Sequence, residues 1–204
     1  MKIICVGRNY VAHAIELGNE VPDSPMLFMK PPTALLLDNK PMYYPDITND
    51  LNYEGELVLK ICKNGRHIQP EYAPTYFSHI GFGIDFTARD LQQRCKEKGH
   101  PWEIAKAFDF SAPISQKFIE VSSMPDSKSI KFEMALNGKT VQQGDSALMI
   151  YNFTDIICYA SKFFKLQVGD YIFTGTPSGV GPVKRGDILV GSIEGQKMLT
   201  CEIK

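Results

Sequence analysis

One short stretch, from Asn52 to Lys60, constrains the fold more than any other part of the sequence. Its residues alternate between polar and apolar, which is typical of a β-strand, and side chains two positions apart in a strand point to the same face. Glu54 and Glu56 are therefore predicted to project side by side. Two carboxylates on one face repel each other unless a cation or a proton lies between them. This stretch raises the hypothesis of a metal site.

An amphipathic strand with its carboxylates in water is the alternative interpretation, and Leu57 and Leu59 would form its apolar face. Val58 shares the face of the two glutamates, however, so that face is not simply polar. Hard cations such as Mg²⁺ and Ca²⁺ prefer carboxylate oxygen. Both interpretations stay open on these residues alone.

The composition indicates a globular protein. At 204 residues, with 44% hydrophobic and 22% charged residues, the chain is long enough for one domain with an ordinary core, and we expect a single domain over residues 1–204. The net charge of −1 favours neither a nucleic-acid nor a membrane partner. Sixteen glycines and thirteen prolines between short β-type runs predict a strand-rich, turn-rich fold.

The N-terminal residues and the cysteines point to the cytoplasm. The first residues lack the long apolar core of a signal peptide, and no stretch has the apolar length of a membrane span. The five cysteines are an odd number and are widely scattered without a C-x-x-C pair, so we expect neither a disulfide framework nor a zinc site. Free thiols in a cytoplasmic protein are the expectation.

Local patterns predict several short elements. We expect a short helix over residues 9–17 with Asn9 as its N-cap, a hairpin turn at residues 63–66, a helix that Thr87 and Asp90 cap and Gly99 ends, and a helix over residues 152–165. The predicted strands cover residues 2–6, 27–30, 52–62, 79–86, 130–136, 140–143, 171–174, 188–190 and 198–203.

Asp85 lies where an apolar strand leads into a helix. It could stabilise the helix dipole, but Thr87 is predicted to take the capping role, which leaves Asp85 without an obvious structural one. Together with the two glutamates it would supply three carboxylates from two strands, half of an octahedral metal shell.

Other candidate residues allow two interpretations each. His13 and Glu16 are three apart on a predicted helix, where they are either an oriented base pair or an ordinary surface pair. Lys106 has apolar neighbours and either snorkels or is a buried cation that binds an anion. The glycine-rich stretch 174–182 is either a plain turn or a loop that presents N–H groups to a carboxylate. Walker, Rossmann and nucleophile-elbow patterns are absent from the sequence.

Taken in order along nearly the whole chain, these stretches resemble the fumarylacetoacetate hydrolase (FAH) family, in its compact single-domain branch. The matching segments are Gly7-Arg8-Asn9-Tyr10 with His13 and Glu16, Phe28-Met29-Lys30-Pro31, Tyr53 to Leu57, Asp85 to Gln92, Pro101-Trp102 with Lys106, and Thr174 to Gly181. Each segment is weak alone, and the ordered set is specific.

The resemblance implies an α+β, β-rich fold, a mixed β-roll with a few short helices and a lid segment at about residues 9–25, in a homodimer. It implies a divalent cation, Mg²⁺ with Mn²⁺ or Ca²⁺ as alternatives. Carried over by position, the metal ligands are Glu54, Glu56 and Asp85, the catalytic residues are His13, Glu16 and Lys106, and the substrate-binding residues are Arg89, Gln92 and Thr176.

The activity expected from this resemblance is hydrolysis of a C–C bond in 2,4-dioxo acids, with water activated by His13 and release of pyruvate and a carboxylic acid. The same electron sink would serve oxaloacetate decarboxylation or isomerisation of a hydroxy-diene-dioate. A catalytically inactive metal-binding scaffold is the alternative from another class, and the intact His13–Glu16 pair argues against it.

Overall fold

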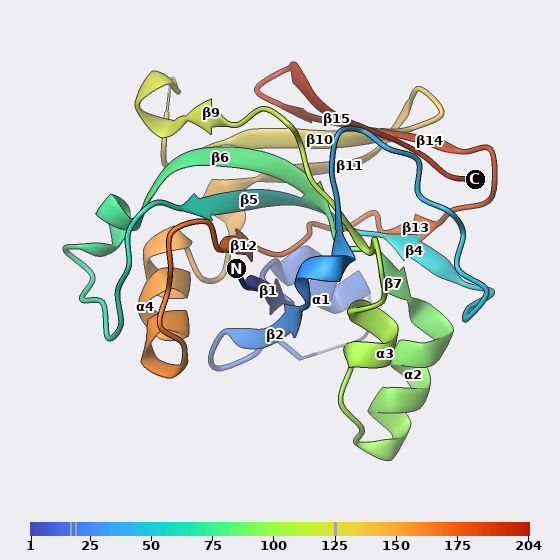
Figure 1. Cartoon of the computed structure of the whole chain (residues 1–204), viewed down its shortest axis with the longest axis horizontal. Helices are drawn as coiled ribbons and strands as arrows, with labels where there is room; N and C mark the ends of the chain where they lie inside the picture. Colours follow the sequence, from blue (N-terminus) through green and yellow to red (C-terminus); the bar gives the residue numbers. More distant parts are fainter. Residues whose placement is uncertain (17, 19, 125) are drawn as a thin grey trace.

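The computed structural model describes residues 1–16, 18, 20–124 and 126–204, and it has an α+β, strand-rich fold. Figure 1 shows two larger sheets stacked on each other, with α4 below one end of them and α2 and α3 below the other. The helices are α1 (Val11–Glu16), α2 (Arg89–Lys98), α3 (Glu103–Lys106) and α4 (Phe153–Phe163), and short 3₁₀ turns cover Pro32–Ala34, Ala73–Tyr76, Val121–Ser123 and Ser146–Leu148. None of the described helices has both the length and the apolar character to cross a membrane.

The largest sheet has the strand order β2-β1-β12-β5-β6-β9. Its strands are β1 (Ile3–Gly7), β2 (Met26–Lys30), β5 (Gly55–Ile61), β6 (Phe77–Ile84), β9 (Ile119–Glu120) and β12 (Tyr171–Phe173). β1 runs parallel to β12, and the other neighbours are antiparallel, so the sheet is mixed. In the β5–β6 pair Glu56 lies opposite Gly83, which fixes the glutamate beside the end of β6.

A second, antiparallel sheet packs over β5 and β6. It has the order β11-β10-β14-β15, formed by β10 (Lys131–Leu136), β11 (Lys139–Asp145), β14 (Ile188–Ile193) and β15 (Gln196–Glu202). Phe82 of β6 meets Phe132 of β10 edge to face, at 6.2 Å between ring centroids. A Cβ at position 191 would lie 2.2 Å from the Phe82 ring. Gly191 therefore allows the two sheets to approach each other closely.

Smaller sheets complete the fold around the ends of β5 and β6. They pair β13 (Gly181–Pro182), β4 (Leu51–Tyr53) and β7 (Thr87–Ala88) in one sheet, and β3 (Leu35–Leu36) with β8 (Ala112–Pro113) in another. The predicted helix over 152–165 is confirmed as α4, which Asn152 and Asp155 cap reciprocally, and Gly99 ends α2 with a φ of 64°.

Three local predictions were wrong. Residues 63–66 form no hairpin, because Gly65 pairs with Leu166 and the next strand begins only at Phe77. Asn9 does not cap α1, because its side chain binds the backbone of Tyr151 and Thr174. The predicted end of that helix at Leu17 lies outside the described residues.

The third error concerns Thr87. Ala88 precedes α2 without a side-chain cap, and the Thr87 hydroxyl donates to Glu54 Oε1 at 3.0 Å instead. Asp90 binds Thr48 and the backbone of Asn49 and Leu91. The capping box predicted from local spacing is therefore absent from α2, because Thr87 and Asp90 form hydrogen bonds with residues distant in the sequence.

Candidate metal centre

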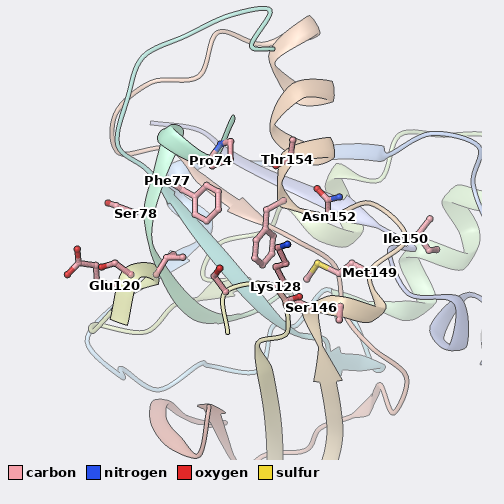
Figure 2. Close-up of a pocket in the computed structure, with 15 residues that line it drawn as sticks. Pro74, Phe77, Ser78, Glu120, Lys128, Ser146, Met149, Ile150, Asn152 and Thr154 are labelled. Carbon is pink, nitrogen blue, oxygen red and sulfur yellow. The ribbon is translucent and has the colours of Figure 1, made fainter. Parts of the chain in front are cut away.

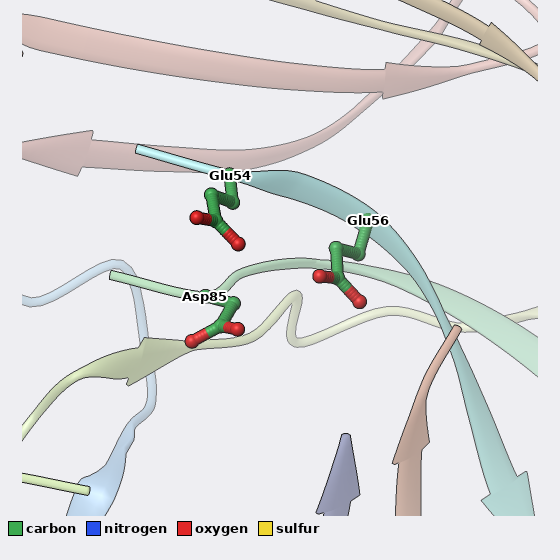
Figure 3. Close-up of side chains that lie close together, drawn as sticks. All are labelled: Glu54, Glu56 and Asp85. Carbon is green, nitrogen blue, oxygen red and sulfur yellow. The ribbon is translucent and has the colours of Figure 1, made fainter. Parts of the chain in front are cut away.

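The three predicted carboxylates lie together in the structure (Figure 3). Glu54 lies between β4 and β5, Glu56 is on β5, and Asp85 directly follows β6. One oxygen from each of the three lies within 4.8 Å of the other two, and all three residues are buried. The Asp85 N–H donates to the Glu54 carbonyl at 2.8 Å, so the antiparallel pair holds the carboxylates at one end of the sheet.

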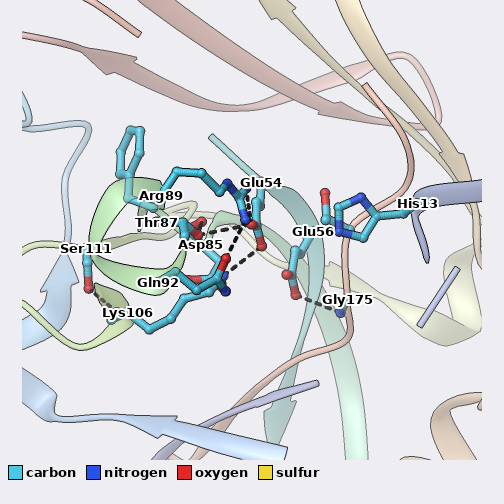
Figure 4. A network of polar contacts seen from close by, with 12 residues as sticks. His13, Glu54, Glu56, Asp85, Thr87, Arg89, Gln92, Lys106, Ser111 and Gly175 are labelled. Carbon is cyan, nitrogen blue, oxygen red and sulfur yellow. Dashed lines mark hydrogen bonds and ion pairs between the residues drawn. The ribbon is translucent and has the colours of Figure 1, made fainter. Parts of the chain in front are cut away.

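Three cations contact two of these carboxylates, and Figure 4 labels two of the three, Arg89 and Lys106. Lys106 of α3 bridges the pair, with Nζ 2.8 Å from Glu54 Oε2 and 2.7 Å from Asp85 Oδ2. Arg89 of α2 reaches the other Glu54 oxygen at 2.7 Å. Lys106 is 2% exposed, so it is the buried cation of the two interpretations that its sequence context allowed.

Lys30 is the third cation, and sequence reasoning did not single it out as a site residue. It is fully buried at the end of β2, and its Nζ lies 2.7 Å from Asp85 Oδ1. The same ammonium donates to the Phe86 carbonyl, to both oxygens of Ser111 and to the Lys106 carbonyl. The sequence signals were a lysine that ends an apolar strand before two prolines, a pattern that many edge strands share, and its place in the family-like segment Phe28-Met29-Lys30-Pro31.

The electrostatic environments of the two glutamates differ. Burial alone would raise the pKa of Glu54, but the charges of Lys106 and Arg89 outweigh burial and hold this pKa well below its usual range. Burial raises the pKa of Glu56 well above its usual value, and the charges of Asp85 and Glu54 raise it further. The Gly175 N–H donates to Glu56 Oε2 at 2.7 Å and opposes this increase only in part.

This donor set fits a hard divalent cation. Three carboxylates offer the oxygen ligands that Mg²⁺ and Mn²⁺ prefer. Within the described residues, Asp85 Oδ1 is a buried oxygen that accepts no hydrogen bond, although its ion-pair partner Lys30 Nζ lies 2.7 Å away. A cation beside Glu56 would also relieve the repulsion among three buried carboxylates.

The other predicted site residues line the same cavity, which has a volume of about 30 Å³, except Glu16, which reaches it only through His13. His13 Nδ1 lies 3.2 Å from Glu16 Oε2, and the other Glu16 oxygen accepts from the Gly179 N–H at 2.9 Å. The loop after β12 thus presents N–H groups to carboxylates, those of Glu16 and Glu56. The cavity is lined by His13, Glu54, Glu56, Asp85, Arg89, Gln92, Lys106 and Thr176, together with Val6, Gly7, Arg8, Met26, Phe28, Lys96 and Trp102.

The predicted substrate-binding residues are already hydrogen-bonded to protein groups. Arg89 Nη1 donates to Gln92 Oε1 at 2.8 Å. The Thr176 hydroxyl donates to the Gly55 carbonyl at 3.0 Å and accepts from Gln142 Nε2 at 2.8 Å. Gln142, which sequence reasoning missed, also accepts from the Gly55 N–H and so fixes the backbone between the two glutamates.

A larger cavity of about 790 Å³ lies elsewhere, between β6, the 3₁₀ turn at Ser146 and the start of α4 (Figure 2). Residues such as Phe77, Met149 and Phe153 line it, and it shares no lining residue with the carboxylate cavity. The buried carboxylates and their cations thus gather in the smaller cavity.

Fold and site together define a metal-dependent enzyme of the FAH type, and comparison with known proteins agrees. The chain matches the fumarylacetoacetate (FAA) hydrolase C-terminal family over residues 2–204, and it belongs to that family.

Its similar relatives are compact proteins of comparable length. The chain is 40% identical to the mitochondrial oxaloacetate tautomerase FAHD1 of Bos taurus, over 95% of this chain and 87% of the relative. It is 39% identical to the oxaloacetate tautomerase YcgM of Escherichia coli, over 98% of this chain and 91% of the relative. The crystal structure of a Pseudomonas aeruginosa fumarylpyruvate hydrolase in complex with Mn²⁺ and pyruvate superimposes with a TM-score of 0.93 and 38% identity, covering 100% of this chain and 89% of that one.

Proposed function

We propose that this protein is a magnesium-dependent enzyme that converts a small 2-oxo acid through its enolate, and that it interconverts the keto and enol forms of oxaloacetate. The observation that carries this proposal is the meeting of three carboxylates, Lys106 and His13 in one cavity. The names of the FAHD1 and YcgM relatives support the choice of oxaloacetate.

Glu54, Glu56 and Asp85 would hold the cation. When bound there, a divalent cation polarises the oxygens of a 2-oxo acid as a Lewis acid and makes the adjacent C–H bond more acidic. We assign Mg²⁺ to this role, with Mn²⁺ as an alternative, because all three ligands are hard carboxylate oxygens.

His13 would move the proton. Its imidazole is buried, lines the cavity and is oriented by Glu16 at 3.2 Å, the arrangement that a general base needs. It would take the proton from C3 of oxaloacetate, and a proton would be returned to the O2 oxygen to complete the enol. Lys106 would place a fixed positive charge close to the oxygen on which negative charge develops.

Hydrolysis of a 2,4-dioxo acid is the second candidate, and the His13–Glu16 pair is the observation that favours it. Glu16 is held from the other side by the Gly179 N–H at 2.9 Å, so the imidazole has a fixed partner that would stabilise its charged form after it deprotonates water. In this reaction the attack of hydroxide on the distal carbonyl breaks the C–C bond and leaves pyruvate as its enolate.

The test follows the decay of enol-oxaloacetate by its ultraviolet absorbance, above the uncatalysed rate, with Mg²⁺ and then with a chelator. We expect catalysis that needs Mg²⁺ and is lost in Glu54→Ala, and His13→Gln should slow it by about 10²–10⁴-fold. His100→Gln changes an exposed histidine after α2 and should leave the rate unchanged. Full activity in chelator would contradict the metal role.

A substrate panel separates the two candidates. Acetylpyruvate and fumarylpyruvate should give pyruvate only if C–C hydrolysis occurs, and oxaloacetate should give pyruvate and carbon dioxide only if decarboxylation occurs. If kcat/KM for acetylpyruvate exceeds that for enol-oxaloacetate, hydrolysis is the main activity and the tautomerase assignment is wrong.

A further inference from the structure

Two cations in the carboxylate cavity take no part in its ion-pair network. Arg8, between β1 and α1, and Lys96, on α2, both line the cavity and are partly buried. Within residues 1–16, 18, 20–124 and 126–204, no acidic side chain lies within ion-pair distance of either one. The carboxylates of the site are paired with Lys30, Arg89 and Lys106 instead.

The Lys96 ammonium is affected by the other positive charges that line the cavity. Burial lowers the pKa of the Lys96 ammonium, and the positive charges of Arg8 and Arg89 lower it further. The Lys96 ammonium also lies over the Trp102 ring, 5.8 Å from its centroid. Like charges that converge in a partly buried site are stabilised when an anion binds between them.

The backbone at Arg8 is held in a strained conformation. Its φ is 56°, a left-handed conformation that is costly for a long side chain and that glycine or asparagine adopts more easily. Neighbouring Asn9 enforces it, because the Asn9 side chain hydrogen-bonds to Tyr151 and Thr174 and its carbonyl accepts from the Ile150 N–H. Strain of this kind persists where the surroundings over-determine it, often at a ligand site.

Lys96 is aligned with the predicted substrate-binding residues of α2. Arg89, Gln92 and Lys96 are spaced by three and four positions, so they lie along one face of the helix. All three line the cavity. Arg89 is tied to Glu54, which leaves Lys96 as the member of this row that is free to bind an anion.

We infer that Arg8 and Lys96 form a subsite for a second, distal carboxylate of the substrate, so that the cavity selects dianionic over monoanionic 2-oxo acids of the same length. This inference rests on the proposed function, because the carboxylate cluster with its cation must hold the 2-oxo end of the ligand. The carboxylate cluster would bind the reacting 2-oxo end of the substrate, and Arg8 and Lys96 would bind its distal carboxylate.

Calorimetric titration of the Mg²⁺-loaded protein tests the inference without turnover. The ligand pair is 2-oxoglutarate and 2-oxopentanoate, which have five carbons each and differ in a carboxylate or a methyl group at the far end. Wild type should bind the diacid about tenfold or more tightly, as expected for one charge-assisted hydrogen bond. Oxalate, which has no distal group, reports on the metal end alone.

Two variants remove the cations separately. Arg8→Asn tolerates the left-handed backbone, so it should fold with unchanged or higher stability, and Lys96→Met keeps the stem over Trp102. Each should reduce the preference for the diacid to about threefold or less and leave oxalate affinity within about twofold of wild type. Lys98→Met changes an exposed lysine on the same helix and should leave the preference intact.

The outcomes separate this inference from the proposed function. If loaded wild type binds oxalate but shows no preference for the diacid, or if the variants weaken both acids equally, the subsite is wrong and the metal site stands. If loaded wild type binds neither oxalate nor any 2-oxo acid, the proposed function fails and the subsite fails with it.

Discussion

The two ends of the carboxylate cluster have opposite environments although one strand segment carries both glutamates. At the Glu54–Asp85 end, Lys106, Arg89 and Lys30 all lie within 2.8 Å of a carboxylate oxygen. At the Glu56 end, the hydrogen-bond partner is a backbone N–H from Gly175.

This difference explains why neighbours with the same burial have pKa values shifted in opposite directions. Glu54 is 5% and Glu56 2% exposed, so burial penalises both charges to a similar extent. Cations of the protein lower the pKa of Glu54, whereas Asp85 and Glu54 raise that of Glu56. One end of the cluster is neutralised by the protein itself, and the other end is left for an external cation.

Removal of the Lys30 ammonium should disturb the neutralised end most strongly. Lys30→Met leaves Asp85 Oδ1 without its ion-pair partner, with only Lys106 still paired to Oδ2, and it removes a donor from several carbonyls, so we expect the free energy of unfolding to fall by about 3–5 kcal/mol. Urea denaturation in the presence of a chelator measures the change in the free energy of unfolding. Lys197→Met, at an exposed position on β15, should change stability by no more than about 0.5 kcal/mol. A loss below about 1 kcal/mol in Lys30→Met would show that Asp85 does not depend on this lysine.

Mg²⁺ should stabilise the protein through the end that lacks a protein cation. At 100 times its dissociation constant, Mg²⁺ should raise the free energy of unfolding of wild type by about 2.7 kcal/mol. This gain should vanish in Glu56→Gln and in Asp85→Asn, because each removes a ligand charge. Glu71→Gln, at an exposed position, should keep it. Thermal denaturation with and without Mg²⁺ measures this stabilisation. If Mg²⁺ stabilises Glu56→Gln as much as wild type, Glu56 is not a metal ligand.

Neutralising each glutamate in turn sharpens the comparison in the absence of metal. Glu54→Gln leaves Arg89 without its carboxylate partner and Lys106 with Asp85 alone, and it should cost about 2 kcal/mol of stability. Glu56→Gln removes a repelled charge and should cost less than about 0.5 kcal/mol or stabilise the protein. Denaturation of both variants in chelator measures the difference, and equal losses would contradict the asymmetry between the two ends.

The pH dependence of stability should have opposite signs at the two ends. The pKa of Glu56 is raised above 4.5, so in chelator the unfolded chain loses this proton before the folded chain does, and stability falls as the pH rises above about 4.5. The pKa of Glu54 is lowered, so its contribution is present above about 4.5 and is lost as the pH falls below it.

Stability curves of wild type and the two Gln variants between pH 3 and 8 test this. The difference between wild type and Glu56→Gln should decrease with rising pH, by at most about 1.4 kcal/mol per pH unit. The difference between wild type and Glu54→Gln should decrease with falling pH. A shared direction for both variants would contradict the assignment.

Local patterns predicted those features that local physics controls. The alternation around Glu54 and Glu56 placed both on one face, and the cap residue Asn152 marked the start of α4. Local patterns gave a wrong prediction where a side chain forms its hydrogen bond with a residue distant in the sequence. Thr87 has the spacing of a helix cap, yet its hydroxyl binds Glu54, 33 residues away.

The sequence by itself determined the family, the E-x-E strand and the residues that can act as acids, bases and ligands, because composition, strand periodicity and motif order are carried by the chain. Only the tertiary structure decided that Lys30 pairs with Asp85 and that Arg8 and Lys96 line the cavity with no carboxylate partner among the residues that the structure describes. These facts depend on which charges meet in a buried space, and Lys30 and Asp85 are 55 positions apart in the chain. Coulomb interactions act over ångströms in space, and sequence separation does not measure them.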